Sequence, residues 1–457
     1  MGKHNEGSAY LEIAHKAWGR NASIRKARER NKNFTYGRQW DDLVRNSDGA
    51  IVSEFEKNTH DGKTPSTNNL IRQLVKSVVG RFRASMEDVP KDIADSLYVN
   101  GCEELDSRML EEFLISGCAF QRVDIGESGK VTVRNVSPAM AFNGKVCDPR
   151  GKDCDLIGQL HDMSMGEILL RFSDGKREKA VEICRIFDSM SADQNGAGGF
   201  YCSNDDDKYR VVELWMKESR EVYECHDREN GKFFIAEPDY ASTLPGSVEK
   251  WWTLRNVWRC RWIAPNGAII SQYDSAIGHP FAFKYYPLVD GEVHSFVEDV
   301  IDQQKFVNRM ITIIDHVMDS TAKGVLLYPC NMLPNGFTWS DLKKAWKTPN
   351  AVIPYENLQG AIGEKPEQLV VNGSNSGAYE LLNLQMGLFE KISGVSAALQ
   401  GQNVGGVNGA RLYDSQVENA TISLLDIFAS FKSFLADRND KIRNNLQYHP
   451  TAQKTEK

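Results

Sequence analysis

The feature that most constrains the fold is an amphipathic segment from Ser295 to Ala322 that contains neither glycine nor proline. Ser295 and Glu298 have the spacing of a capping box, which marks a helix start. About 28 residues at 1.5 Å each would form a rod of roughly 40 Å. Its apolar residues recur at helical spacing, at Phe296, Val297, Val300, Ile301, Val307, Met310, Ile311, Ile314, Val317 and Met318. Another helix or another chain has to cover this broad stripe.

A second rod is predicted from Ser376 to Val395, and its apolar face consists of Tyr379, Leu382, Met386, Phe389 and Ile392. Between the rods, residues 324–363 predict a small module with a strand at Val325–Tyr328 and a basic helix near Ser340–Lys347. The two rods and the module together predict an antiparallel stalk with a tip.

A glycine-rich stretch, Gln400–Ala410, follows the second rod and has polar but uncharged side chains. A third helix is predicted from Arg411 to Arg438, followed by a polar tail. The stretch lacks the Gly-Lys-Ser/Thr sequence of a nucleotide-binding loop, so we interpret it as a flexible connection between helices.

The region before the first rod combines helices with strands. Helices are predicted at Ser8–Lys32, which is strongly basic, after a cap at Asn68 or Asn69, and at Lys91–Ser116 with a break at Gly101. From Phe120 onward, β-branched and alternating runs predict strands, with one helix inserted at Lys176–Met190. The expected fold class is α+β.

The net charge argues against a general nucleic-acid coat. The 457 residues contain 55 Lys+Arg and 62 Asp+Glu, a formal charge of −7. Residues 1–85 contain 16 basic and 9 acidic side chains, so they carry +7 and the remainder carries −14. We find no apolar run long enough for a membrane span, and the nine irregularly spaced cysteines are expected to be unpaired thiols in the cytoplasm.

No catalytic motif is recognisable in the sequence. Nucleophile elbows, zinc-binding helices, dinucleotide-binding loops and kinase motifs are all missing from it. The segment Ser191–Lys208 is expected to be a surface loop, and its acids Asp205, Asp206 and Asp207 leave a metal-dependent nuclease as a remote alternative. We therefore expect no enzyme activity, no metal and no cofactor.

The order of these elements resembles that of the portal (head-to-tail connector) proteins of tailed double-stranded DNA bacteriophages, particularly their podovirus-type branch. The resemblance covers roughly residues 8–434. It is carried by Tyr36-Gly37-Arg38-Gln39-Trp40, Asn69-Leu70-Ile71, Val79-Gly80-Arg81, the aromatic strand Pro280–Tyr286, Asp302-Gln303-Gln304 with Asn308, and Ser393-Gly394-Val395.

The resemblance implies a portal fold. It divides the chain into a wing with a basic N-terminal arm (1–293), a first stem helix (294–322), a clip (323–375), a second stem helix (376–398), a tunnel loop (399–410), and a crown-proximal helix with a polar tail (411–457). Family members commonly continue into a longer crown than this sequence contains.

The resemblance also implies partners. Copies of the chain, twelve as in that family, would form a ring at one capsid vertex of the virion, after assembly in the host cytoplasm. Double-stranded DNA would pass through the ring during packaging and ejection. The large terminase subunit and then adaptor or tail proteins would bind the clip, and a major capsid or scaffold protein would contact the ring.

Three groups of candidate site residues follow from the resemblance. The tunnel loop would present Gln400, Gln402, Asn403, Asn408 and Arg411 to DNA. The stem would present Lys305, Arg309, Glu298 and Asp302. The clip would bind terminase or adaptor through Lys343, Lys344, Trp346 and Lys347.

An acidic body with an uncharged loop suits a channel in which DNA slides, because every neutralised phosphate adds affinity that would slow the duplex. A different virion ring or minor head protein, which binds DNA or scaffold through the basic run Arg25–Lys32, remains the main alternative.

Overall fold

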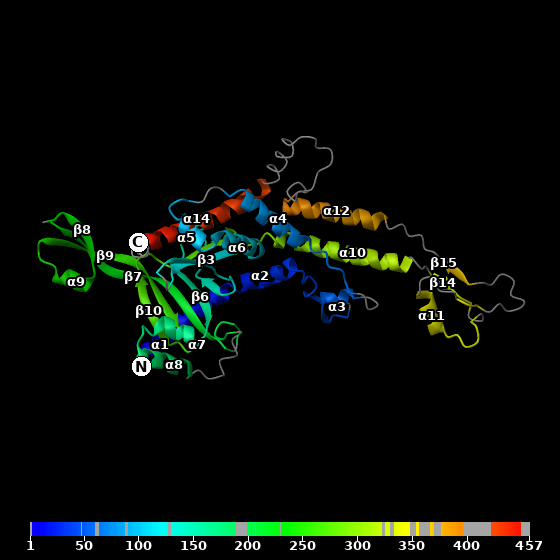
Figure 1. Ribbon diagram of the computed structural model, residues 1–457, viewed down its shortest axis with the longest axis horizontal. Helices are drawn as coiled ribbons and strands as arrows, with labels where there is room; N and C mark the ends of the chain where they lie inside the picture. Colours follow the sequence, from blue (N-terminus) through cyan, green and yellow to red (C-terminus); the bar gives the residue numbers. More distant parts are fainter. Residues whose placement is uncertain are drawn as a thin grey trace, which may run out of the picture. The chain divides into compact units, whose positions relative to one another are not determined.

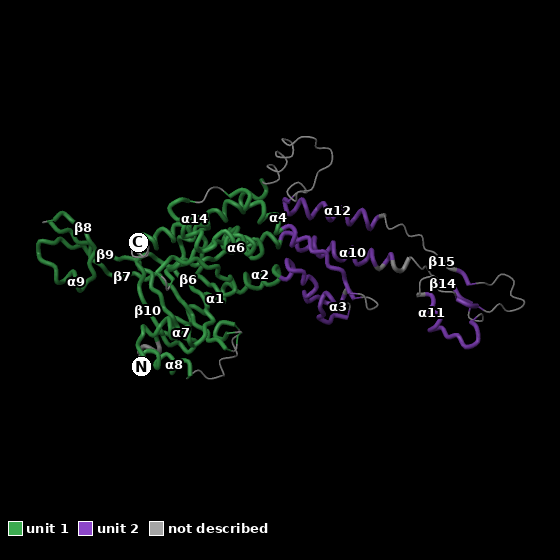
Figure 2. The backbone as a smooth tube through the Cα atoms, viewed as in Figure 1, with its two compact units in different colours: residues 1–32, 75–298, 406–457 green, residues 33–74, 299–405 purple. Residues whose placement is uncertain are grey.

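The computed structural model describes residues 2–46, 48–59, 64–86, 90–126, 129–188, 199–203, 205, 207–228, 230–321, 325–329, 333–347, 353–355, 366–369, 376–395 and 422–448. The chain divides into two compact units (Figure 2). Unit 1 contains residues 1–32, 75–298 and 406–457, and unit 2 contains residues 33–74 and 299–405. Helices and sheets occur together, as expected for the α+β class (Figure 1).

Unit 1 is built on a six-stranded antiparallel sheet. Its strands are β5 (Ala141–Asn143), β6 (Leu156–Met163), β7 (Tyr209–Asp227), β8 (Lys232–Ala236), β9 (Val248–Ile263) and β10 (Ile269–Ser275). The order is β10-β9-β7-β6-β5, and β8 pairs with the far end of β7. There β7, β8 and β9 form a ribbon that extends past the rest of the sheet and carries α9 (Pro238–Thr243) (Figure 1).

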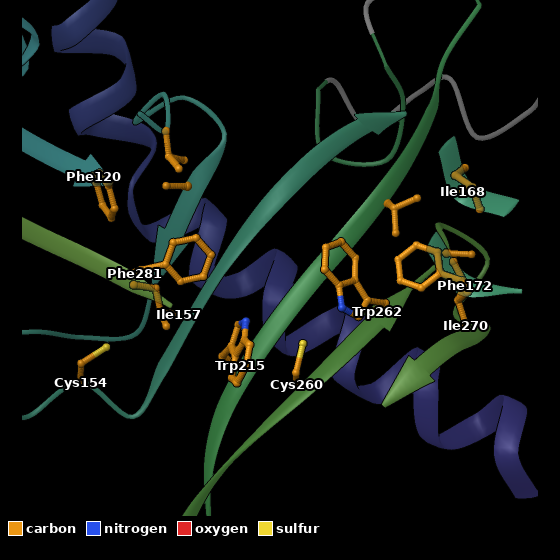
Figure 3. Packing of buried hydrophobic residues seen from close by; sticks show 14 of the residues in the cluster. Phe120, Cys154, Ile157, Ile168, Phe172, Trp215, Cys260, Trp262, Ile270 and Phe281 are labelled. Carbon is orange, nitrogen blue, oxygen red and sulfur yellow. The ribbon is translucent and has the colours of Figure 1, made fainter. Parts of the chain in front are cut away.

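Apolar side chains that alternate in direction along the strands cover both faces of this sheet. Helix α1 (Gly2–Arg20) covers the face with Val212 and Leu214 through Leu11, Ala14 and Ala17. The opposite face, with Trp215 and Trp262, is covered by α7 (Met165–Phe172) and α8 (Arg177–Asp188). Figure 3 shows the ring of Trp262 beside Phe172 of α7, and their centroids are 5.0 Å apart.

A second sheet of unit 1 has the order β11-β3-β4 and contributes Phe120 and Phe281 to the same core (Figure 3). Its strands are β3 (Cys118–Ile125), β4 (Val131–Asn135) and β11 (Phe281–Tyr285). Helices α4 (Leu70–Ala84), α5 (Ala94–Val99), α6 (Cys102–Ser116) and α14 (Leu425–Tyr448) accompany it. The short strands β12 (Pro287–Val289) and β13 (Glu292–Val293) form a separate pair.

Several expected boundaries needed correction. The N-terminal basic segment forms two helices, α1 and α2 (Ala22–Thr35), separated at Asn21, whose amide donates to Asn143 Oδ1 at 3.0 Å. The break at Gly101 is confirmed, since Gly101 has a left-handed backbone (φ 60°) between α5 and α6. Helix α14 continues to Tyr448 rather than ending at Arg438, because Ile442 and Leu446 extend its buried face.

Unit 1 buries a carboxylate in the interior of its core. Glu213 of β7 accepts hydrogen bonds from Arg122, from His161 Nε2 at 2.8 Å and from Trp215 Nε1 at 2.8 Å. Burial would raise the pKa of Glu213, but the charge of Arg122 and the bond from His161 outweigh burial and hold the pKa well below its usual range. The carboxylate therefore stays ionised and ties β3, β6 and β7 together.

Two buried histidines of unit 1 predict a loss of stability in mild acid. Burial lowers the pKa of His161 and of His279 from the ordinary 6.5, and Lys441 and Lys217 lower that of His279 further. Below pH 6.5 the unfolded chain takes up protons that the folded chain does not, so stability falls as the pH falls. From about pH 8 to about pH 5.5, we therefore expect the unfolding free energy to decrease, with the larger contribution from His279, whose pKa lies well below 6.5.

Denaturant unfolding at both pH values measures this loss. His279→Gln should reduce this loss, and His294→Gln, which changes an exposed ring, is the matched control. An unfolding free energy that is equal at the two pH values would contradict this prediction.

Candidate functional site

The first predicted rod is present in unit 2, but it begins later than expected. Helix α10 spans Ile301–Thr321 and is preceded by a 3₁₀ turn, Glu298–Val300. The capping box is confirmed: Glu298 Oε2 accepts from Ser295 N at 2.8 Å, and Ser295 Oγ accepts from Glu298 N at 3.3 Å. Within unit 1, Val297 N instead donates to the Leu114 carbonyl at 3.2 Å. This bond keeps the residues before α10 out of the backbone hydrogen bonding of the helix.

The second predicted rod is helix α12, Ser376–Ser393. It lies antiparallel to α10 in Figure 1 and packs against it. Val307 and Ile314 of α10 and Phe389 of α12 are buried. Near the far end of the pair, the Tyr379 hydroxyl donates to Met318 Sδ at 3.3 Å. The predicted antiparallel stalk is therefore observed within unit 2.

Helix α12 carries more apolar surface than its contact with α10 covers. Leu381, Leu384, Leu388 and Ile392 follow one another at intervals of three and four residues, which places them along one side of the helix. Leu384 is 58% exposed and Ile392 is 44% exposed. On α10, Ile313 is 52% exposed. A row of large exposed apolar side chains of this kind is typical of an interface with another protein.

A buried network of amide side chains anchors the first turns of α10 in unit 2. Gln304 Oε1 accepts from the backbone N–H groups of Leu70 at 3.0 Å and Ile71 at 3.3 Å, and Gln304 Nε2 donates to the Asn68 carbonyl at 2.6 Å. Asn69 caps α4 as expected, because its Oδ1 accepts from Arg72 N at 3.1 Å. Gln304 thus satisfies the N–H group of Ile71 at the helix start and shares that of Leu70, which also donates to the Asn68 carbonyl at 3.0 Å.

The same network continues to the turn after α2. Asn308 Oδ1 accepts from Asn68 N at 3.0 Å, and Asn308 Nδ2 donates to Gln39 Oε1 at 2.6 Å. Gln39 Nε2 in turn donates to the Phe34 carbonyl at 2.8 Å. Residues that carry the portal resemblance in three distant parts of the sequence are therefore connected by one hydrogen-bonded network. Two amides four residues apart within an apolar stripe were the available signal for this role.

The two basic residues proposed for the stem have acidic partners within unit 2. Lys305 Nζ lies 2.5 Å from Asp42 Oδ2 and 3.1 Å from Glu54 Oε2, and Arg309 also pairs with Glu54. Glu54 is 1% exposed and begins the short helix α3 (Glu54–Asn58), which follows the β1 (Leu43–Arg45) and β2 (Ile51–Ser53) hairpin. Asp302 is exposed, and Glu298 serves the capping box.

The predicted clip contains a two-stranded sheet and one helix in its described part. Strands β14 (Val325–Leu327) and β15 (Glu367–Leu369) pair antiparallel, and α11 spans Trp339–Lys347. Thr338 caps α11, since its Oγ1 accepts from Asp341 N at 3.2 Å. Lys343 and Lys344 are exposed and Trp346 is half-buried, whereas the Lys347 side chain lies outside the described part.

The tunnel-loop prediction lies outside the described residues. Gln400, Gln402, Asn403, Asn408 and Arg411 all belong to the segment 396–421, and Asp206 of the alternative metal site is also outside. Asp205 pairs with Lys208 at 3.0 Å. In the described ranges, no group of three or more His, Cys, Asp or Glu side chains is arranged to hold a metal ion. The eight cysteines in those ranges are free thiols, as expected.

Some side chains of the basic arm form contacts within unit 1. Arg28 makes two hydrogen bonds to Glu112, at 2.6 and 2.8 Å. Arg25 lies over the ring of Trp18 and donates to its carbonyl at 2.6 Å. Lys26 and Lys32 are exposed. The arm is therefore attached to the body through alternate basic residues, which leaves the others at the surface.

The mixed body, the paired rods and the small module at their tip have the element order expected of a structural connector. The chain matches the Phage P22-like portal protein family over residues 11–411. The chain therefore belongs to this family of bacteriophage portal proteins, structural head–tail connectors of the virion that serve genome packaging. Comparison with curated proteins finds no match. In the described part of the chain, none of the helices has the length and apolar character to cross a membrane.

Proposed function

We propose that copies of this chain form a closed ring at one capsid vertex and that the ring is the channel for packaging and ejection of the genome. The observation that supports it best is the exposed apolar side of α12, with Leu384 and Ile392, together with Ile313 on α10. Two helices bury little of their surface against each other, so this side needs a further partner. A neighbouring identical rod pair supplies one through a heterologous contact, which repeats around a ring.

In this proposal the tunnel loop 399–410 faces the duplex and contributes Gln400, Gln402, Asn403 and Asn408, with Arg411 at its end. On the stem, Glu298 and Asp302 give an acidic wall that does not hold phosphates. Lys305 and Arg309 would have to share or release Asp42 and Glu54 to contact DNA. We therefore expect them to bind the duplex weakly.

Deleting Gln402–Gly409 tests the channel role. Rings should still assemble, because the rods remain, but heads assembled with the shortened protein should package or retain much less DNA. A packaging assay with purified proheads, read as protected DNA per head, measures this. Failure of rings to form would make the loop an assembly element, and normal packaging would contradict a role in the channel.

We also propose that the clip binds the terminase motor and then an adaptor or tail protein through Lys343, Lys344, Trp346 and Lys347. Trp346 is half-buried beside the exposed Lys343 and Lys344, and tryptophan is enriched among the residues that dominate the binding energy of interfaces. Trp346→Ala with Lys347→Ala should weaken terminase binding without changing ring size. Unaltered binding would count against this assignment.

A further inference from the structure

A cavity of about 380 Å³ in unit 1 is lined by three basic side chains, of which Arg122 pairs with Asp124 and Glu213. Its walls come from β3, from β7 and β10, from the loop Ser275–Pro280 and from the last turns of α14. Arg171 at the end of α7 and Lys441 of α14 both line it. The contacts of these two residues determine what the cavity can hold.

Among the described residues, Lys441 has one hydrogen-bond acceptor. Its Nζ donates to the His279 carbonyl at 3.1 Å, although an ammonium group has three protons to donate. No carboxylate of the described residues lies within 4.0 Å of it, and Asp437, one turn earlier in α14, acts on it only over a longer distance. Burial lowers the pKa of Lys441, as expected for a charge that is only partly compensated.

Arg171 is held by stacking rather than by an acid. Its guanidinium carbon lies 4.2 Å from the ring centre of Trp262 and 5.7 Å from that of Phe172. Within the described part of the chain it forms no ion pair. Burial lowers the pKa of Arg171, and repulsion from Arg122 lowers it further. A stacked guanidinium keeps the N–H groups at its edge available for an anion.

The acids that line the cavity already have other partners. Asp124 accepts from Arg122 at 2.5 Å and also lies 3.4 Å from Arg134. Asp274 pairs with Arg220 at 2.6 Å and with Arg259 at 2.8 Å. Arg171, which is exposed, and Lys441, which is half-buried, therefore have no ion-pair partner among the described residues.

We propose that this cavity binds a phosphate-type oxyanion, with Lys441 and Arg171 as its charged ligands and Asn444 and the backbone of Ser275–Gly278 as neutral neighbours. The site goes beyond the proposed channel function and does not depend on it. The oxyanion can be free phosphate or a phosphodiester group of nucleic acid, which share this chemistry.

The test is thermal unfolding of the full chain in sodium phosphate and in sodium chloride at equal ionic strength. Phosphate should raise the midpoint of the unmodified protein in a saturable manner. Lys441→Met and Arg171→Gln should each weaken the apparent phosphate affinity about tenfold or more, because a charged hydrogen bond is lost. Lys152→Met, an exposed residue outside the cavity, is the matched control.

A second readout distinguishes binding from a merely structural role. Without phosphate, Lys441→Met should unfold no earlier than the unmodified protein, because it removes a half-buried and poorly paired charge. Stabilisation by a short oligonucleotide at lower concentration than phosphate would support a phosphodiester, and stabilisation by phosphate alone would support the free anion. An equal midpoint shift in both variants and in the control, or no shift in the unmodified protein, would overturn the proposal.

Discussion

Replacing Gln304 with leucine is expected to lower the free energy of unfolding by about 2–4 kcal/mol, although the two side chains have similar volumes. The substitution removes three hydrogen bonds in a site where Gln304 is fully buried, and it leaves the N–H group of Ile71 without a partner. Leu70 N still donates to the Asn68 carbonyl, at 3.0 Å. Each unsatisfied buried group costs about 1–3 kcal/mol. Denaturant unfolding gives the total effect, and hydrogen exchange at Leu70 and Ile71 gives the local one.

The neighbouring Gln303 offers a matched control, because it is only half-buried and lies one residue away on the same helix. Gln303→Leu should change stability by no more than about 0.5 kcal/mol. The backbone amide hydrogens of Leu70 and Ile71 should exchange faster in the Gln304→Leu variant but not in the Gln303→Leu variant. If the two variants unfold at the same denaturant concentration, the network does not anchor α10 as described.

Replacing Arg438 with methionine is the second large effect that we expect, at about 3–5 kcal/mol. The Arg438 guanidinium is 2% exposed and donates to both oxygens of Asp106, at 3.1 Å each. Asp106 Oδ1 also accepts from Gln121 Nε2 at 3.0 Å. The variant leaves a buried carboxylate without its counter-charge, and the pair joins α14 to α6 and β3 within unit 1.

A double-mutant cycle separates the pair from its surroundings. Asp106→Leu alone should be comparably destabilising, since it leaves the arginine unpaired. The double variant, Asp106→Leu with Arg438→Met, should recover a large part of the loss because no buried charge remains. Additive losses in the denaturant midpoints would mean that the pair is not coupled.

Local sequence patterns predicted most of the helices and strands, but not every residue at which they begin and end. The periodicity of apolar residues located α10, α12 and α6, and glycine chemistry located the break at Gly101. The start of α10 was predicted too early because the capping box of Ser295 and Glu298 is real, yet Val297 N bonds to Leu114 in another part of unit 1. A contact over more than 180 positions has no local signal.

The sequence identified individual residues of the candidate site, but it did not show which residues pair with one another. Lys305 and Arg309 look like cations on a polar helix face, and only the fold brings Asp42 and Glu54 to them. Gln39, Asn69, Gln304 and Asn308 were recognised through the resemblance without a role, because a hydrogen-bonded network depends on tertiary structure. The wing, stem and clip boundaries and the tunnel-loop residues stay predictions.

The central claim is that identical neighbours cover the exposed apolar side of the rod pair. The most direct measurement is the mass of the purified full-length assembly over a dilution series, together with a projection image. We predict a closed ring with a central opening, and Leu384→Lys with Ile392→Lys should reduce it to smaller species that remain folded. A stable folded single copy of the unmodified chain at all concentrations would contradict the account.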